Sequence, residues 1–271
     1  MEAVADGPVL NVGPSPARED DHTPDAAEGK GHLRPVDPPE RIDLRAPWYT
    51  VRDQGKTGSC VGWALADSVM WRQLVKAERL TSDQRLSPRF MWMAAKEMRA
   101  KLTEVKGEPA WRPTTFLEQG MTDVKSALDV ARVYGAALED DLPFDDGLYE
   151  GSVEEFYEAA GRRKITHYYR LDPDEDVSGE WFLHWRRWLA QQGPVLVVVR
   201  VDKAFVDGRP LLERYDEATA SFNHAAALVG YDSGGFVIRC SWGPGWGEDG
   251  HVVATESYME RATLETYGVV V

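Results

Sequence analysis

The sequence is poor in cysteine and in basic residues, and each shortage excludes a class of protein. Cys60 and Cys240 are the only cysteines among 271 residues, so a framework of disulfide bonds is nearly excluded and a cytoplasmic setting is expected. Lysine and arginine number 31 against 45 aspartate and glutamate residues, which gives a net charge of −14. This balance leaves no basic footprint for nucleic acid or for an anionic membrane surface, and neither is an expected partner.

Long apolar runs are also missing. The longest, such as VLVVV at 195–199, have the length of a strand and are too short to span a membrane. The N-terminus, MEAVADGPVLNVG, lacks the basic start and the apolar segment of a secretory signal, so export is not expected. Isoleucine and asparagine are scarce and arginine outnumbers lysine, which hints at a GC-rich bacterial genome.

What is present indicates a sizeable folded core. Hydrophobic residues make up 43% of the chain and charged residues 28%, and the length suffices for one large domain or two lobes. Residues 1–40 differ from the rest, because they are rich in proline, glycine and acidic residues and show no apolar period. We expect them to form a flexible tail or a strap on the surface, whose removal is not required for activity.

Helices and strands are predicted in separate halves of the chain. Helical patterns run over 59–79, 88–101, 122–134, 153–161 and 180–192. The first half of the first of these is apolar nearly all round, as in a helix buried between layers. After residue 193 the segments are short, rich in β-branched residues and separated by turns. Helices early and an antiparallel sheet late predict an α+β protein with two segregated lobes.

Cys60 stands at the predicted start of the buried helix, which Ser59 can cap. Backbone N–H groups and the helix dipole at that end favour a thiolate. Gly55, Gly58 and Gly62 permit the close backbone approach that an oxyanion site requires. A buried free cysteine is also a common inert core residue, so this segment alone leaves a catalytic and a structural thiol open.

His224 lies in SFNHAAALVGYD, at the head of an apolar strand. A lone histidine in that place is often a satisfied structural residue. A third segment, GFVIRCSWGPGWGEDG, carries two Trp-Gly pairs in a turn-rich loop directly after a strand. The three segments together are more specific than any one of them.

In combination they resemble the papain family of cysteine peptidases. DQGKTGSCVGWA resembles that family's nucleophile segment, NHAAALVGYD its histidine strand, and SWGPGWGEDG the loop after its orienting Asn. Weaker similarities, including RIDLRAP and DVKSALDVARVYG, extend the resemblance over about residues 41–255. It implies a two-lobe fold in which a helical lobe, 41–150, packs against a β-barrel-like antiparallel lobe, 151–271, with the active site in the cleft.

The resemblance implies a role for each matching residue. Cys60 would be the nucleophile, held as a thiolate by the imidazolium of His224, and would form an acyl-enzyme with a peptide or protein substrate. The Cys60 backbone N–H and the Gln54 side chain would hold the oxyanion. Trp242 would cover the histidine from water. The resemblance implies no cofactor and no metal ion.

Four further residues are implied beside the cleft. Gly120 would align the substrate backbone, and Met121, Phe222 and Asn223 would wall the pocket for the second substrate residue from the cut. That wall is mostly apolar, so a hydrophobic or aromatic preference is expected there. Ordinary core packing is the competing interpretation for Met121 and Phe222.

Cys240 departs from the family pattern, because the family's orienting Asn immediately precedes Ser-Trp-Gly and cysteine stands here instead. It lies sixteen residues after His224, the spacing that the resemblance requires. A thiol accepts hydrogen bonds weakly, so it would hold the imidazole less firmly than an amide oxygen would. Four interpretations follow: a weak orienter, a mark of a peptide-binding pseudoenzyme, a redox partner of Cys60, or a zinc ligand together with Cys60 and His224.

Two other departures concern processing. Thr57 replaces the family's extra cysteine before Gly-Ser-Cys, so the structural disulfide is missing, and so is the long inhibitory pro-domain. The favoured function is thiol-dependent hydrolysis of peptide bonds in the cytoplasm. Acyl transfer to an amine uses the same pair of residues and stays open, as does peptide binding without turnover. The oligomeric state is not predicted.

Overall fold

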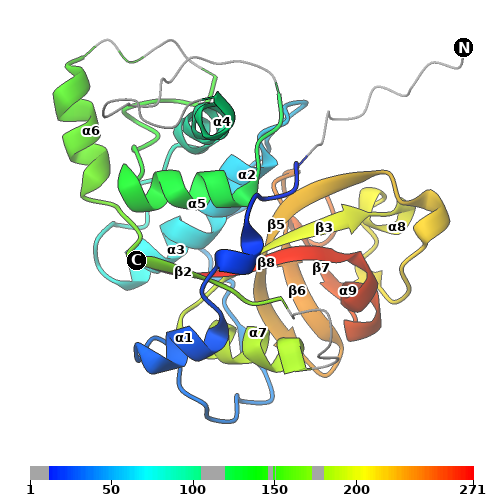
Figure 1. Cartoon of the computed structure of the whole chain (residues 1–271). Helices are drawn as coiled ribbons and strands as arrows, with labels where there is room; N and C mark the ends of the chain where they lie inside the picture. The colour runs from blue at the N-terminus through cyan, green and yellow to red at the C-terminus, as the bar shows by residue number, and fades with distance from the viewer. Residues whose placement is uncertain (1–11, 105–119, 146–148, 150, 173–179) are drawn as a thin grey trace, which may run out of the picture.

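The computed structural model describes residues 12–104, 120–145, 149, 151–172 and 180–271 (Figure 1). Its helices are α1 (Pro24–Gly29), α2 (Cys60–Gly62), a π-helical stretch (Trp63–Met70), α3 (Trp71–Lys76), α4 (Pro88–Glu104), α5 (Val124–Val133), α6 (Val153–Gly161), α7 (Glu180–Gln191), α8 (Lys203–Val206) and α9 (Glu256–Ala262), with 3-10 turns at Arg18–Asp20 and Glu217–Thr219. Helices α2 to α6 gather on one side of the molecule, and α8 and α9 lie with the strands on the other (Figure 1). This segregation confirms the predicted α+β class.

The strands of the described part form one sheet of eight. They are β1 (Ile42–Asp43), β2 (His167–Arg170), β3 (Val195–Val201), β4 (Leu211–Leu212), β5 (Phe222–Asp232), β6 (Gly235–Arg239), β7 (His251–Ala254) and β8 (Thr263–Val270). Their order is β2-β8-β3-β5-β6-β7-β4, with β1 beside β5. All these pairs are antiparallel except β4 with β7. The antiparallel sheet predicted after residue 193 is confirmed, and β1 and β2 join it from earlier in the chain.

The chain from Cys60 to Lys76 is one continuous helix made of α2, the π-helical stretch and α3. Residues 60–71 are all buried, as the largely apolar sequence predicts. Gly62 permits the close crossing of α4, because a Cβ atom there would lie 2.4 Å from the Pro88 carbonyl oxygen. This helix therefore runs through the interior and brings its first residue, Cys60, into the core.

Helix ends differ from prediction where capping decides them. The predicted cap by Ser59 is wrong: its hydroxyl makes no capping bond and instead accepts from Trp63 Nε1 at 3.1 Å. The helix predicted from residue 122 begins at Val124, because the Asp123 carboxylate accepts from the backbone N–H of Ser126 at 2.8 Å. Such ends depend on side-chain rotamers that the apolar period does not specify.

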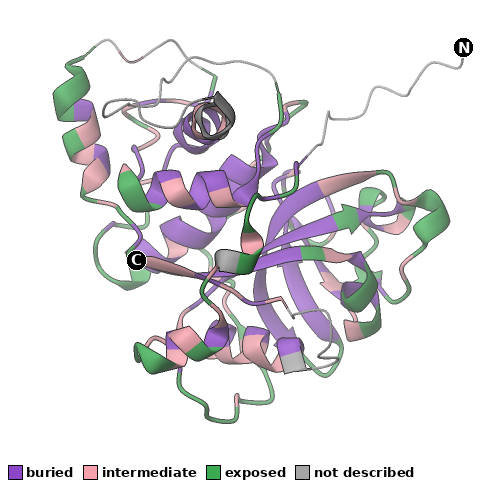
Figure 2. Cartoon of the chain, viewed as in Figure 1, coloured by how far each residue is buried: buried purple, intermediate pink, exposed green. Residues whose placement is uncertain are grey.

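Strand β5 lies between two apolar layers. Its alternate residues enter different clusters, Ala225 and Ala227 on the side of the buried helix and Ala226 and Leu228 on the side of α7. Figure 2 shows the strands of the sheet buried along most of their length. The strand that begins at Phe222 and carries His224 is therefore held from both faces.

The described part of the N-terminal segment, 12–40, lies against the body of the protein. Val12, Ala27 and Leu33 are buried, and α1 packs beside β2. The first eleven residues of the predicted tail lie outside the described residues, and the predicted boundaries at 40 and 150 stay predictions. In the described ranges, no helix combines the length and the apolar character needed to cross a membrane.

Candidate active site

The Cys60 thiol is fully buried at the first residue of α2. Burial raises its pKa to about 11, although backbone N–H groups of Ala225, Val61 and Cys60 itself donate to the sulfur and favour the thiolate. The helix end supplies the donors that the sequence predicted, but desolvation outweighs them. Cys60 is therefore a neutral thiol at pH 7 in this structure.

His224 lies directly before Ala225 on β5 and is also fully buried. Its Nε2 is 3.1 Å from the Cys240 sulfur, and its Nδ1 is buried without a hydrogen-bond partner. Burial lowers the pKa of the ring to about 3, so the imidazole is neutral at pH 7. Nε2 thus contacts Cys240, and Nδ1 is free to accept a proton. The next residue, Ala225, donates its backbone N–H to the Cys60 thiol.

Cys240 occupies the place behind the His224 ring. Burial raises the pKa of this thiol well above its ordinary value, so it keeps its proton. A thiol both donates and accepts weakly, whereas an amide oxygen only accepts and would require a proton on Nε2. The contact with Cys240 therefore does not fix which nitrogen of the ring carries the proton.

Gln54 is buried beside the loop that follows Cys240. Its Nε2 donates to the Thr57 carbonyl at 2.8 Å, and its Oε1 accepts from the Ser241 hydroxyl at 2.6 Å. Its backbone N–H donates to the Ser241 carbonyl at 2.8 Å. These bonds fix the amide plane. Because an amide nitrogen carries two hydrogens, one is left for a ligand.

Trp242 packs against the candidate base with its ring tilted. Its ring centroid is 4.6 Å from that of His224 at an interplanar angle of 44°, and Phe205 and Trp246 pack edge-on against it at 5.5 and 5.3 Å. The aromatic group excludes water from one side of the imidazole, which is a cause of its lowered pKa.

The residues predicted to bind substrate lie in two segments. Met121 is 43% exposed, and the carbonyl of Gly120 accepts from Trp92 Nε1 at 3.1 Å. Phe222 and Asn223 are half-buried at the start of β5, next to His224. Met121 and Phe222 therefore leave part of their apolar surface accessible, and their role in substrate binding stays a prediction.

The N-terminal segment reaches these residues, which the sequence did not indicate. Asn223 Nδ2 donates to the carbonyl of Val12 at 3.1 Å, and the backbone N–H of Gly13 donates to the carbonyl of Thr122 at 3.0 Å. Val12 is 2% exposed and shares the apolar cluster of Cys60. The short apolar run PVLNV at 8–12 stands out within an otherwise polar segment and could have suggested this contact.

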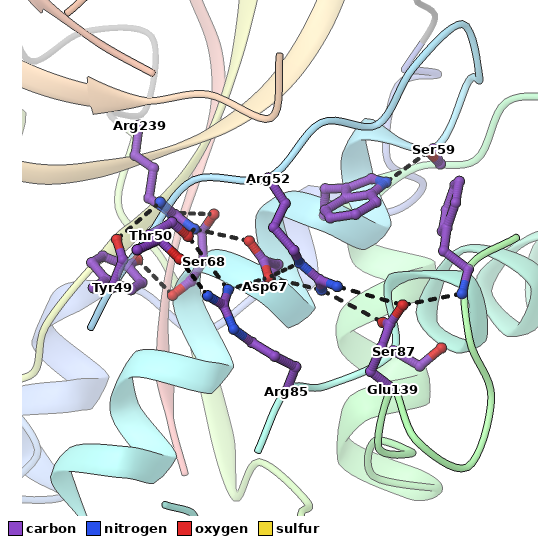
Figure 3. Close-up of polar contacts among 12 residues, drawn as sticks. Tyr49, Thr50, Arg52, Ser59, Asp67, Ser68, Arg85, Ser87, Glu139 and Arg239 are labelled. Carbon is purple, nitrogen blue, oxygen red and sulfur yellow. Dashed lines mark hydrogen bonds and ion pairs between the residues drawn. The ribbon is translucent and has the colours of Figure 1, made fainter. Parts of the chain in front are cut away.

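An ionic cluster centred on the buried Asp67 joins the segments around the site (Figure 3). Asp67 accepts from Arg52 at 2.9 Å, from Arg85 at 3.0 Å and from Arg239 at 2.8 Å. Glu139 lies 3.4 Å from Arg52 and adds a second carboxylate. We call these five residues the Asp67 cluster.

The Asp67 cluster positions the candidate catalytic residues through the backbone. Asp67 belongs to the helix that begins at Cys60, Arg52 precedes Gln54 by two residues, and Arg239 immediately precedes Cys240. A carboxylate within an apolar helix is the sequence feature that could have predicted the cluster, because a buried charge requires partners.

The structure bears on two of the four interpretations of Cys240, as a redox partner of Cys60 and as a zinc ligand. Both cysteines are free thiols. Within the described ranges, no three histidine, cysteine or acidic side chains converge as a metal ion requires, so the zinc interpretation has no structural support.

Solved structures of cysteine proteases share the fold. Xylellain, a cysteine protease from Xylella fastidiosa, superposes with a TM-score of 0.74 at 20% identity, over 96% of this chain and 95% of that one. Procathepsin L 3 from the larval midgut of Tenebrio molitor superposes with a TM-score of 0.63 at 18% identity, over 88% of this chain and 72% of that one. Procathepsin B S9 from Trypanosoma congolense gives 0.65 at 14% identity, over 96% and 86%. These likenesses confirm the papain-like fold.

Sequence comparisons are shorter but place the chain in a family. The gamete and mating-type specific protein A of Dictyostelium discoideum is 39% identical over 71 residues, which are 25% of this chain and 15% of that protein. The chain thus matches only a small part of that relative. The model of the papain family of cysteine proteases matches residues 120–270, more than half of the chain, and the chain therefore belongs to this family.

Proposed function

We propose that the protein hydrolyses peptide bonds through a thioester on Cys60, with His224 as the base. The observation that carries the proposal is the state of the His224 ring: Nε2 is held by Cys240 at 3.1 Å, and Nδ1 is buried and unpartnered. The thiol of Cys60 accepts from the backbone N–H of Ala225, the residue that follows His224. This contact supports the pairing of Cys60 as nucleophile with His224 as base.

The neutral forms of both groups define the first step. As the Cys60 sulfur attacks the scissile carbonyl carbon, its proton passes to Nδ1 of His224 and the carbonyl oxygen becomes an oxyanion. When the carbon–nitrogen bond breaks, the leaving amine takes that proton from the imidazolium. Water then attacks the thioester with His224 again as base, which releases the acid and restores the thiol.

The oxyanion is assigned to two N–H donors. The first is the backbone N–H of Cys60, at the start of the buried helix. The second is the N–H of Gln54 that its bonds to Thr57 and Ser241 leave available. Donors fixed in advance stabilise the charge without reorganisation, which is why such groups contribute strongly to the rate.

The substrate is a peptide or protein whose second residue from the cut is apolar. Met121 and Phe222 supply the exposed apolar surface for it, and Gly120, with no side chain in the way, leaves room for an extended backbone. A cytoplasmic setting is part of the proposal, because both thiols are free.

A cleavage assay with a peptide library under reducing conditions tests the proposal. Wild type should cleave a subset of peptides, Cys60→Ala should be inactive, and circular dichroism should show both to be folded. Lys203→Met, at an exposed position on α8, serves as the control with full activity. Activity in folded Cys60→Ala protein would exclude Cys60 as the nucleophile.

Peptide binding without turnover is the second candidate, and Cys240 favours it. If the ring rests with its proton on Nδ1, His224 cannot accept the proton of Cys60. A thiol-directed peptide probe distinguishes the two functions: labelling of Cys60 without release of product supports binding alone. The same assay with an added amine detects ligated product if acyl transfer competes.

A further inference from the structure

A cavity distinct from the candidate active site lies between the N-terminal segment, α5 and β2. Its volume is about 420 Å³, a size typical of small-molecule sites, and none of its lining residues belongs to the candidate active site. Charged and polar side chains line it, so an apolar ligand does not suit it.

The charges in this cavity run against those of the whole protein. Lys30, Lys125 and Arg132 line it together with only two carboxylates, Asp21 and Asp129. The cavity is thus positive in a chain whose net charge is −14. Lys30 comes from the N-terminal segment and Lys125 and Arg132 from α5, and together they exceed the two carboxylates by one positive charge, which favours an anionic ligand.

Both carboxylates are already occupied by donors of the protein. Asp21 accepts from Lys125 Nζ at 2.6 Å and Asp129 from Arg132 Nη2 at 2.9 Å. Asp21 also accepts from the Tyr267 hydroxyl at 2.8 Å, and Asp129 from the Tyr168 hydroxyl at 3.0 Å. Their repulsion toward a bound anion is therefore partly neutralised, while Arg132 has further N–H groups to offer.

The remaining donors have no acidic partner. Lys30 takes part in no ion pair among the described residues, and His22 and His167 line the same cavity. The Nδ1 atom of His167 is buried without a hydrogen-bond partner. Its pKa is lowered by burial and then by repulsion from Lys30, His32, His22 and Arg132.

We propose that this cavity binds a small phosphate-bearing anion, held by Lys30, Arg132 and the imidazoles of His22 and His167. A phosphate group has several strong acceptor oxygens and a charge near −2, so it can engage the Arg132 guanidinium and Lys30 together. A carboxylate has one charge and fewer acceptors, and it would leave part of the cluster unmatched. Bound phosphate also links the N-terminal segment, which supplies Lys30, to α5 and β2.

Isothermal titration calorimetry of the full chain with inorganic phosphate tests the site. Wild type should show saturable binding to one site. Lys30→Met should weaken it about five- to tenfold, because one charged hydrogen bond is lost. Lys203→Met removes the same charge on α8 and should leave the affinity unchanged.

A variant of opposite sign sharpens the test. Asp129→Asn keeps an oxygen acceptor for Arg132 and removes a negative charge from the cavity, so phosphate should bind more tightly. In histidine-ring NMR spectra, phosphate should shift the resonances of His167 and leave those of His251, which is remote from this cavity, unchanged.

The source of the phosphate is decided by comparing probes. Adenosine monophosphate and glycerol phosphate binding more tightly than inorganic phosphate would identify an organic phosphate ester as the ligand, and equal affinities would identify the free ion. Equal weakening by Lys30→Met and Lys203→Met would overturn the proposal in favour of diffuse attraction, as would the absence of saturable binding. None of these readouts depends on peptidase activity.

Discussion

Arg239 and Cys240 are neighbours in the chain, yet their side chains are held in opposite ways. The Arg239 guanidinium is buried and donates to a carboxylate, a hydroxyl and two backbone carbonyls. The Cys240 sulfur makes one side-chain hydrogen bond, to His224. The fold thus fixes the frame of the candidate site with charged hydrogen bonds and contacts the candidate base with a weak one, so we expect stability and activity to depend on different neighbours.

The largest effect is expected from removing the carboxylate that holds Arg239. Asp67→Asn should lower the free energy of unfolding by about 3–5 kcal/mol, because the buried Arg239 and the partly buried Arg52 and Arg85 lose their shared counter-charge. Asp207→Asn, which removes an exposed pair with Lys203, should cost less than about 1 kcal/mol. Urea unfolding measures both. A loss below about 1 kcal/mol for Asp67→Asn would show that the cluster is not a stabilising frame.

The oxyanion donor comes next in size. Gln54→Ala should lower kcat by about 10²–10³, the usual effect of losing one donor of this kind. Ser241→Ala is the control, since it removes the bond to Gln54 Oε1 and leaves the Nε2 donor in place. Steady-state kinetics compare the two variants. An equal decrease of kcat in both would mean that Gln54 acts by holding the loop.

Access to the site gives a smaller effect of the opposite sign. Removal of residues 1–14 takes away Val12 and Gly13, and with them the bonds to Asn223 and Thr122. The segment contacts residues predicted to bind substrate, so loss of two hydrogen bonds of about 1 kcal/mol each should raise kcat/KM by about thirtyfold. Such a rise is compatible with the expectation drawn from the sequence, that activity does not require removal of the tail. Unchanged kcat/KM in the folded, shortened chain would show that the segment does not limit access to the site.

Replacing Cys240 is expected to change kcat least. Cys240→Asn should raise kcat about five- to tenfold, because an amide oxygen keeps the proton on Nε2 and leaves Nδ1 free to accept. Cys240→Ala should retain activity below that of wild type. Steady-state kinetics on both variants and on Cys240→Ser measure the series. A dead Cys240→Ala enzyme would give the thiol a chemical role, and inactivity of every variant would favour binding without turnover.

Several elements could be predicted from the sequence because local patterns decide them. The long apolar run from Cys60 and the short β-branched segments after residue 193 are local signals, and the structure has the helix and the strands there. The segments around Cys60 and His224 also predicted the family. The ends of the helices were less predictable, since a single capping side chain such as Asp123 moves them.

The candidate site was predicted as a set of residues but not as an environment. The thiolate expected from the helix end at Cys60 is opposed by burial, which raises its pKa to about 11. Burial of this kind depends on residues from distant parts of the chain, and the apolar cluster that contains Cys60 also includes Val12. The N–H donors at the start of the helix could be predicted from the sequence, but the low dielectric constant around the Cys60 thiol could not.

Local patterns along the chain were enough to predict the α+β class, the family and the order of the chemical groups. Which charges meet is known only from the folded chain: Asp67 lies with arginines from three other segments, and Lys30 lines the cavity between α5 and β2 together with Arg132 and His167. The two differ because the forces involved act over different separations along the chain. Periodicity and capping act over a few neighbouring residues, whereas ion pairing and desolvation act between groups that only folding brings together.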